Sequence, residues 1–410
     1  MFRPRYRGDV PRFEPFTAIR YASSANLDEV IAPPYDVLSE DDVTELGRRS
    51  PYNITWVDVP RGDASRYTVA AFLLDEWLEK TVLVLDEEPS FTIYRMDLVD
   101  ATGVARTISG VLGGLEVVDE GAGGVLPHER TTKKASTDRL DLMVATATNL
   151  SPVWGLSLAS GLTQELAEPG EPMGELVVEG VTHRVERVTD PDRVARIAAI
   201  IGSDDVLIAD GHHRYGVSRT YRNMVRKATH SKDTAAELTL TFVNELIDDQ
   251  LSIEAIHRIY DQISYQDLRD DLSGSFTFED MVETPNPETL AQMVRDDRLI
   301  LLSSSGRAEW LIPRPGAFEG VRSLDGAWLE HALAGSRARV GYQHGLDEVL
   351  AQLRGEGSGK PTAAVLIRPT TLDEITRTAR EGLLMPPKST FFTPKLRTGL
   401  VIRPTARLPR

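Results

Sequence analysis

Asp210-Gly211-His212-His213-Arg214 brings a carboxylate, two imidazoles and a guanidinium together on five consecutive residues. The apolar run 206–209 before this segment has the length and composition of a buried strand, and a helical pattern follows it to about Lys227. A helix N-terminus leaves N–H groups unpaired and carries about half a positive charge, so phosphate or carboxylate oxygens bind there readily. Gly211 permits a sharp turn, and Arg214 offers five donors in a planar fork. The segment is therefore equipped to hold a phosphate.

Two other interpretations of the same segment are possible. Asp210 is a favoured N-cap type, so it could simply cap the helix while the histidines lie on its surface. Adjacent histidines point about 100° apart on a helix and to opposite faces of a strand, whereas paired metal ligands prefer spacings of three or four. We therefore expect no metal ion held jointly by His212 and His213, and assign no metal ligands.

A second candidate is Pro127-His128-Glu129, which follows a glycine-rich approach and precedes Arg130, Lys133 and Lys134. A carboxylate near a bound phosphate can take the proton from a hydroxyl whose oxygen attacks phosphorus. The alternative is a surface turn whose charges lie in water.

The end of the chain is basic. From Pro386 to Arg410 there is no acidic residue, and the cations are Lys388, Lys395, Arg397, Arg403, Arg407 and Arg410. This stretch is either a solvated tail or a basic arm that folds back onto an anionic ligand. The prolines and aromatic residues of 386–395 favour an ordered loop.

These segments must be positioned by short strands and helices that alternate along the chain, which predicts a mixed α/β (α+β) fold. Helices are expected at 42–46 (with Ser39 as N-cap), 137–148, 191–201 and 287–295, hairpins at 91–111 and 177–188, and strands at 153–158, 206–209, 237–247, 299–302 and 310–312. Gly110-Val111-Leu112-Gly113-Gly114 is interpreted as the bulged end of a strand, with a loop opening at Gly113. No clean linker is visible, so the domains are expected to be interleaved.

Composition limits the possible partners. The chain has 410 residues, enough for two or three domains, and lacks cysteine, which excludes disulfides, thiolate zinc sites and cysteine nucleophiles. A net charge of −16 repels a phosphate backbone, so no nucleic-acid partner is expected. No secretory signal and no run of roughly 18 apolar residues is present, so we expect a soluble cytoplasmic protein without a membrane partner. The phosphate-loop, dinucleotide and Gly-x-Ser-x-Gly esterase motifs are absent.

The two candidate segments, taken together, resemble a known group. Asp210 to Arg214 is similar to the signature of the ParB/sulfiredoxin-like superfamily, and closest to its free serine kinase branch, where a Pro-His-Glu segment precedes an Asp-Gly-His-His-Arg segment. That resemblance implies that Glu129 is the catalytic base, assisted by His128 and Asp210. It also implies a phosphate site made by Asp210, Gly211, His212, His213 and Arg214, on a ParB/sulfiredoxin-like core with elaborations.

Over nearly its whole length the chain resembles a broader group known as domain of unknown function 1015. The matching stretches are 32–37, 127–129, 209–215 and 385–400, together with His257-Arg258. Three features depart from the patterns: Ile256 stands where threonine is expected, Tyr215 stands where the kinases often have an indole, and about eighty positions separate Glu129 from Asp210. The hairpin at 177–188 is one place where that extra length could be absorbed.

The resulting expectation is a nucleotide-dependent phosphotransferase acting on a small hydroxyl substrate, with free L-serine or O-phosphoserine the most specific choice. ATP or ADP is the expected nucleotide, and Mg²⁺ would bridge its phosphates. Asp36 is assigned to that ion or to a substrate ammonium, or is simply a turn residue. Lys388 and Lys395 are expected at the phosphates, with His257 and Arg258 beside the substrate.

The sequence leaves three alternatives open. The same site run backwards would remove phosphate, a ParB-like protein would bind nucleotide without catalysis, and a metal-dependent hydrolase would use His128, His212 and Asp210. Residues 1–235 are expected to form the ParB/sulfiredoxin-like catalytic region with an N-terminal elaboration. Residues 236–410 are expected to form a C-terminal α/β region.

Overall fold

A computed structural model describes residues 10–100, 103–127, 136–356, 361–386 and 388–408. The chain divides into two compact units. Unit 1 comprises Met1–Val99, Ala105–Leu251 and Pro394–Arg410, and unit 2 comprises Asp100–Val104 and Ser252–Thr393. The expected boundary at 235/236 falls within the short 3-10 helix η3 (Ala235–Glu237) of unit 1. The assignment of catalysis to residues 1–235 stays a prediction.

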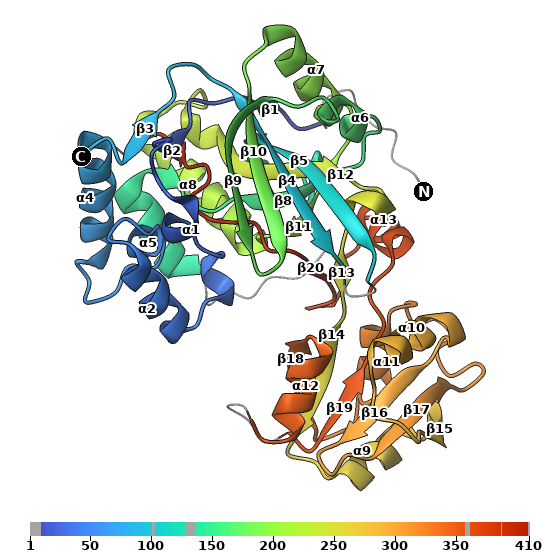
Figure 1. Cartoon of the computed structure of the whole chain (residues 1–410). Coiled ribbons are helices and arrows are strands. Elements are labelled where there is room, and N and C mark those ends of the chain that lie inside the picture. The colour runs from blue at the N-terminus through green and yellow to red at the C-terminus, as the bar shows by residue number, and fades with distance from the viewer. Residues whose placement is uncertain (1–9, 101–102, 128–135, 357–360, 387, 409–410) are drawn as a thin grey trace. The chain divides into compact units, whose positions relative to one another are not determined.

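Unit 1 is built on a large mixed sheet (Figure 1). Among the described residues it has nine strands in the order β6-β11-β8-β12-β5-β4-β10-β9, with β1 paired to β5. Their bounds are β1 Phe13–Glu14, β4 Phe91–Val99, β5 Ala105–Glu116, β6 Val125–Pro127, β8 Val153–Ser157, β9 Glu171–Val178, β10 Val181–Val188, β11 Val206–Asp210 and β12 Leu238–Glu245. Strand β11 is parallel to β6 and β12 is parallel to β8, whereas the other pairs are antiparallel.

Two helices of unit 1 begin at residues whose side chains are predicted to cap them. Ser39 closes a capping box at the start of α2, and Asp190 caps α7 ahead of a proline in its first turn. The helices are α1 Leu27–Val30, α2 Glu40–Arg49, α3 Thr55–Asp58, α4 Arg66–Glu79, α5 Ser136–Thr146, α6 Leu162–Leu166, α7 Pro191–Ile201 and α8 His212–Thr229. Helix α5 packs against both α4 and α8 (Figure 1). The main core joins sheet residues such as Phe91 and Val243 to α6, α7 and Tyr215 of α8.

Strand β5 corrects one expectation. Gly110 and Gly113 lie inside this strand, which continues to Glu116 and pairs with both β4 and β12. A Cβ atom at Gly110 would come within 2.3 Å of Phe242, and one at Gly113 within 2.4 Å of Phe13. The glycines therefore make room for aromatic rings against the sheet, and the expected bulged strand end and loop at Gly113 are wrong.

Unit 2 has a six-stranded sheet among its described residues, in the order β15-β17-β16-β19-β14-β18. The strands are β14 Ile256–Asp261, β15 Phe276–Asp280, β16 Leu299–Ser303, β17 Ala308–Pro313, β18 Arg339–His344 and β19 Ala363–Leu366, with β13 Ile253–Glu254 pairing β20 Phe391–Phe392 outside it. Its helices are α9 Tyr265–Leu272, α10 Pro287–Asp296, α11 Asp325–Ala332, α12 Leu346–Leu353 and α13 Leu372–Glu381. The sheet carries two apolar cores.

The last described residues, 394–408, return to unit 1 as an arm. Thr398 pairs with Ala32, Ile402 pairs with Ile19, and β21 (Arg403–Pro404) pairs with β7 (Thr148–Asn149), while β2 (Ile19–Tyr21) pairs with β3 (Leu83–Leu85). This stretch is thus no solvated tail. The mixed α/β class predicted from the sequence is confirmed. Within the described part of the chain, no helix combines the length and apolar character that crossing a membrane requires.

Candidate functional site

The junction between β11 and α8 forms the centre of the site. Asp210 is the last residue of β11, and Gly211 is the N-cap of α8 with φ of +82°. A Cβ on Gly211 would lie 3.0 Å from Arg214 Nε and 3.3 Å from Val153 Cα, so only glycine fits without strain. The alternative interpretation in which Asp210 caps the helix is wrong, because Gly211 occupies the N-cap position and the Asp210 side chain has other partners.

Those partners are two cations. Arg214 Nη2 donates to Asp210 Oδ2 at 2.7 Å, and Lys395 Nζ donates to Asp210 Oδ1 at 3.3 Å. Burial alone would raise the pKa of Asp210, but Lys395, Arg214 and His212 outweigh it and hold that pKa well below its usual range. Asp210 is therefore an anion that fixes both cations at the start of α8.

Arg214 links three parts of unit 1. Its side chain is 9% exposed, and its Nη1 donates to the carbonyl oxygen of Pro152, just before β8. Its Nη2 lies 3.6 Å from Asp36 Oδ2, in the 3-10 helix η1 (Tyr35–Val37). Burial disfavours the guanidinium charge, yet Asp36 and Asp210 raise its pKa above the usual value. Arg214 is thus a fixed positive charge whose neighbours come from η1, from β11 and from the residue just before β8.

His212 and His213 are the first two residues of α8. His212 contributes to the field that stabilises the Asp210 carboxylate. In the ranges that the structure describes, no group of three or more metal-ligating side chains gathers.

Strands β6 and β11 set the position of the second candidate segment. They run parallel, with Val125 opposite Val206 and Pro127 opposite Ile208. Parallel neighbours end at the same edge of a sheet, so the chain leaves β6 at the edge where Asp210 stands. His128 and Glu129, the next two residues in sequence, lie outside the described residues.

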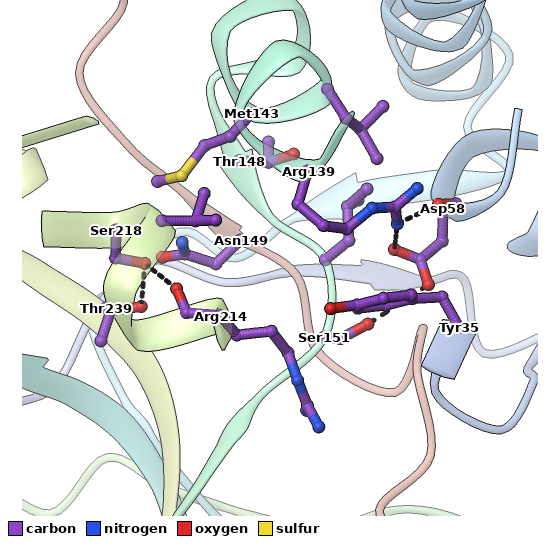
Figure 2. A pocket seen from close by; sticks show the side chains of 13 residues that line it. Tyr35, Asp58, Arg139, Met143, Thr148, Asn149, Ser151, Arg214, Ser218 and Thr239 are labelled. Atoms are coloured by element: carbon purple, nitrogen blue, oxygen red, sulfur yellow. Dashed lines mark hydrogen bonds and ion pairs between the residues drawn. The ribbon is translucent and has the colours of Figure 1, made fainter. Parts of the chain in front are cut away.

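A pocket opens beside Arg214 (Figure 2). One part of its wall is charged and aromatic, from Tyr35, Asp58, Arg139 and Arg214. Hydroxyl and amide groups form another part, from Thr148, Asn149, Ser151, Ser218 and Thr239, and apolar side chains complete it. Figure 2 shows the Arg139 guanidinium directed at Asp58, above the Tyr35 ring at 4.3 Å from its centroid.

Sequence reasoning did not identify Asp58, Arg139 or Ser151. Asp58 ends the short helix α3, Arg139 lies in α5, and Ser151 precedes β8. No motif joins them, and only the fold brings them to one pocket. Tyr35 could have been found, because it stands beside Asp36 in the stretch 32–37 that resembles the family.

Three other predicted residues come together in unit 2. His257 Nδ1 accepts a hydrogen bond from the backbone N–H of Ile367 at 3.1 Å, and burial lowers the pKa of His257 to about 4. Arg258 lies over the Tyr342 ring at 4.8 Å and donates to the carbonyl oxygen of Lys388 at 3.2 Å. Lys388, His257 and Arg258 are therefore neighbours, while Asp36, Asp210, Gly211, His212, Arg214 and Lys395 gather in unit 1.

The model of a family described as "Protein of unknown function (DUF1015)" matches residues 13–327. The chain belongs to this family. The match includes Asp36, Asp58 and Asp210 to Arg214, and it ends before the arm that carries Lys395. A search of curated proteins gave no match.

Several solved structures are similar to parts of the chain. A free serine kinase in complex with AMP is 12% identical, with a TM-score of 0.36 over 66% of this chain and 83% of that one. A conserved hypothetical protein from Pyrococcus furiosus is 11% identical, with a TM-score of 0.36 over 69% and 92%. SbnI with a C-terminal truncation, from Staphylococcus aureus, is 12% identical, with a TM-score of 0.35 over 70% and 84%.

Proposed function

We propose that this protein is a nucleotide-dependent phosphotransferase that acts on a small hydroxyl substrate, with free L-serine or O-phosphoserine as the specific choice. The observation that carries the proposal is the convergence of Arg214 and Lys395 on Asp210 at the N-terminus of α8. Cations and backbone N–H groups at such a helix start are what a nucleotide phosphate requires.

Asp210 acts here as a positioning residue for the phosphate site. Its two oxygens each accept a hydrogen bond from a different cation, which restricts the rotamers of both long side chains. Cations already held in place lose less conformational entropy when a phosphate arrives than free ones would. Gly211, His212 and His213 complete the proposed site by lining the helix start.

Glu129 is the proposed base. The acceptor hydroxyl gives its proton to the Glu129 carboxylate, its oxygen forms a bond to the terminal phosphorus, and the bond from that phosphorus to the bridging oxygen of the nucleotide breaks. The nucleotide product is ADP when ATP is the donor, and AMP when ADP is the donor. The reverse sequence moves phosphate from phosphoserine to the nucleotide. Support comes from β6, which delivers the chain to the edge of the sheet where Asp210 lies.

Mg²⁺ would neutralise charge on the phosphates, and the candidate carboxylates to hold it are Asp36 and Asp210. Mg²⁺ is commonly held by one or two carboxylates together with substrate phosphates. Both Asp210 oxygens accept hydrogen bonds from cations, whereas Asp36 makes a longer ion pair with Arg214 and its side chain is 41% exposed. Asp36 is the better-placed ligand, and a contact to a substrate ammonium is its other proposed role. Contacts of Lys388 with phosphate, and of His257 and Arg258 with substrate, stay predictions.

Phosphorus NMR of the purified chain tests the proposal directly. One tube holds Mg²⁺, ATP or ADP and free serine, and a second holds phosphoserine with or without nucleotide. A phosphoserine signal that appears, or one that disappears only with nucleotide present, supports phosphoryl transfer. No change in any tube, in a protein that binds nucleotide, points to another acceptor. Failure to bind nucleotide as well would overturn the phosphate site.

A further inference from the structure

Asp58 is a buried carboxylate with incomplete pairing. Its side chain is 6% exposed and lines the pocket beside Arg214. Ser151 Oγ donates to Asp58 Oδ2 at 3.3 Å, and Arg139 Nη1 lies 3.5 Å from Oδ1. Charge-assisted hydrogen bonds are usually about 2.7–2.9 Å long, so both contacts are loose. A carboxylate removed from water and held only by loose contacts has capacity for another donor.

Arg139 is not a dedicated partner for this carboxylate. Its Nε and Nη2 donate to Asp138 Oδ2 at 2.9 and 2.7 Å, and its Nη1 donates to the backbone oxygen of Asp58 at 2.5 Å. The guanidinium therefore directs two of its nitrogens to a single oxygen of Asp138. The arrangement fixes Arg139 as a wall of the pocket, stacked on Tyr35 (Figure 2), and the loosely paired Asp58 carboxylate lines the same pocket.

We propose that Asp58 recognises a protonated amino group, so that the pocket selects small amino alcohols or hydroxy amino acids as acceptors. This inference rests on the proposed function, because the pocket shares Arg214 with the phosphate site. An acceptor whose ammonium contacts Asp58 is oriented with its other end free to reach Arg214. Ser151, Ser218 and Thr239 also line this pocket, and their hydroxyl groups hydrogen-bond one another or neighbouring protein groups.

The electrostatics agree with this geometry. Burial raises the pKa of Asp58, against the opposing effects of Arg139, Arg214 and the Ser151 hydrogen bond, while Asp36 adds to the increase. A carboxylate whose charge is poorly compensated gains most when an ammonium arrives. Asp36, the residue that sequence reasoning gave to this role, is exposed and already near Arg214, so Asp58 is the better site.

Calorimetric titration tests whether Asp58 binds the amino group of the acceptor, and it does so without relying on turnover. The full chain, with ADP and Mg²⁺ present, is titrated with L-serine, ethanolamine and 3-hydroxypropionate, which is serine without its amino group. We expect L-serine and ethanolamine to bind the unaltered protein, and 3-hydroxypropionate to bind about tenfold more weakly or worse. Asp58→Asn should lower the affinity for L-serine by a similar factor and leave 3-hydroxypropionate unchanged. Asp75→Asn, an exposed carboxylate that pairs with Arg407, is the matched control.

Several outcomes would overturn the assignment of Asp58 to the amino group. Equal affinities for L-serine and 3-hydroxypropionate in the unaltered chain overturn the inference, whether or not Asp58→Asn folds, as does failure of both amines to bind. Loss of amine selectivity in Asp36→Asn rather than Asp58→Asn moves the site to Asp36 and also overturns it. Phosphoryl transfer to both acceptors with equal efficiency would leave the proposed function standing and the inference refuted. Amine binding that depends on Asp58, without phosphoryl transfer to any acceptor, would support the inference and refute the proposed function.

Discussion

Lys395 Nζ lies 3.3 Å from Asp210 Oδ1, although the two residues are 185 positions apart in the sequence. The contact is made by the arm of residues 394–408, which returns to unit 1 and pairs with Ala32 and Ile19. Arg403 anchors the same arm by donating to the backbone oxygens of Leu238 and Ala235, both at 2.8 Å. The proposed phosphate site therefore includes a cation from outside the region 13–327 that the family model matches.

Replacing Lys395 tests whether the arm contributes to nucleotide binding. Lys395→Met keeps a similar stem and removes the charge, so ADP affinity should fall roughly tenfold, in line with loss of one charge-assisted hydrogen bond. Arg407→Met is the control, because Arg407 lies in the same arm, is exposed and pairs with Asp75 at 3.2 Å. Titration calorimetry with ADP and Mg²⁺ measures both. Equal, small effects of the two substitutions would remove Lys395 from the site.

Gly211→Ala should damage both stability and nucleotide binding. A φ of +82° costs a residue with a Cβ about 1–2 kcal/mol, and the new atom would also press on Arg214 Nε at 3.0 Å. Gly180→Ala is the control, since Gly180 has φ of +79° and a Cβ placed there would meet no atom within 4 Å. Urea unfolding should show a loss in both variants, and only Gly211→Ala should bind ADP more weakly. Unchanged ADP affinity in Gly211→Ala would contradict a role for Arg214 at the phosphates.

Elements with local signals could be predicted from the sequence. Helix α7 begins and ends where expected, because Asp190 caps it, a proline opens it and Gly202 follows it. The strand, turn and helix around Gly211 were predicted from the apolar run 206–209, the glycine and the helical pattern that follows it. The continuation of β5 through Gly110 and Gly113 was not predicted, because these glycines make room for Phe242 and Phe13, which lie on other strands.

The candidate site also combines residues that local motifs indicate with residues that only tertiary contacts bring together. Asp210 has a favoured N-cap side chain, yet its carboxylate is occupied by Arg214 and by Lys395 from the far end of the chain. The pocket depends on Asp58 and Arg139, which are 81 positions apart and carry no motif. Tertiary contacts of this kind leave no periodic trace in a sequence. Motifs therefore pointed to the proposed phosphate site but not to the pocket that we propose for the acceptor.

Glu129→Gln should abolish turnover while leaving nucleotide affinity nearly intact. The amide keeps the size of the side chain but cannot accept the hydroxyl proton, so the loss should appear in kcat rather than in binding. Phosphorus NMR reports turnover, and calorimetry with ADP reports binding. Parallel loss of both would make Glu129 a structural residue and leave the reaction without its proposed base.

Asp58→Asn should raise stability at neutral pH. Because burial raises the pKa of Asp58, the folded state holds its proton more tightly than the unfolded chain does, and ionisation costs stability as pH rises from about 4 through the raised pKa. The amide carries no such cost. The variant should therefore melt at a higher temperature than the unaltered chain at neutral pH, and the difference should shrink as pH falls toward 4.

Asp42→Asn is the comparison with the opposite sign. Hydrogen bonds from the Ser39 side chain and backbone lower the pKa of Asp42, so its contribution is present above its usual pKa of 3.8 and is lost as pH falls through the lowered value. Asp42→Asn should melt below the unaltered chain at neutral pH, with that gap also closing in acid. Thermal melts from about pH 2 to 8 cover the titration of both carboxyl groups and measure both series. If Asp58→Asn instead melts lower at neutral pH, the contact with Arg139 stabilises the fold and Asp58 is a structural ion-pair partner. A higher melting temperature combined with weaker amine binding would mean that unit 1 keeps a costly charge for the sake of its ligand.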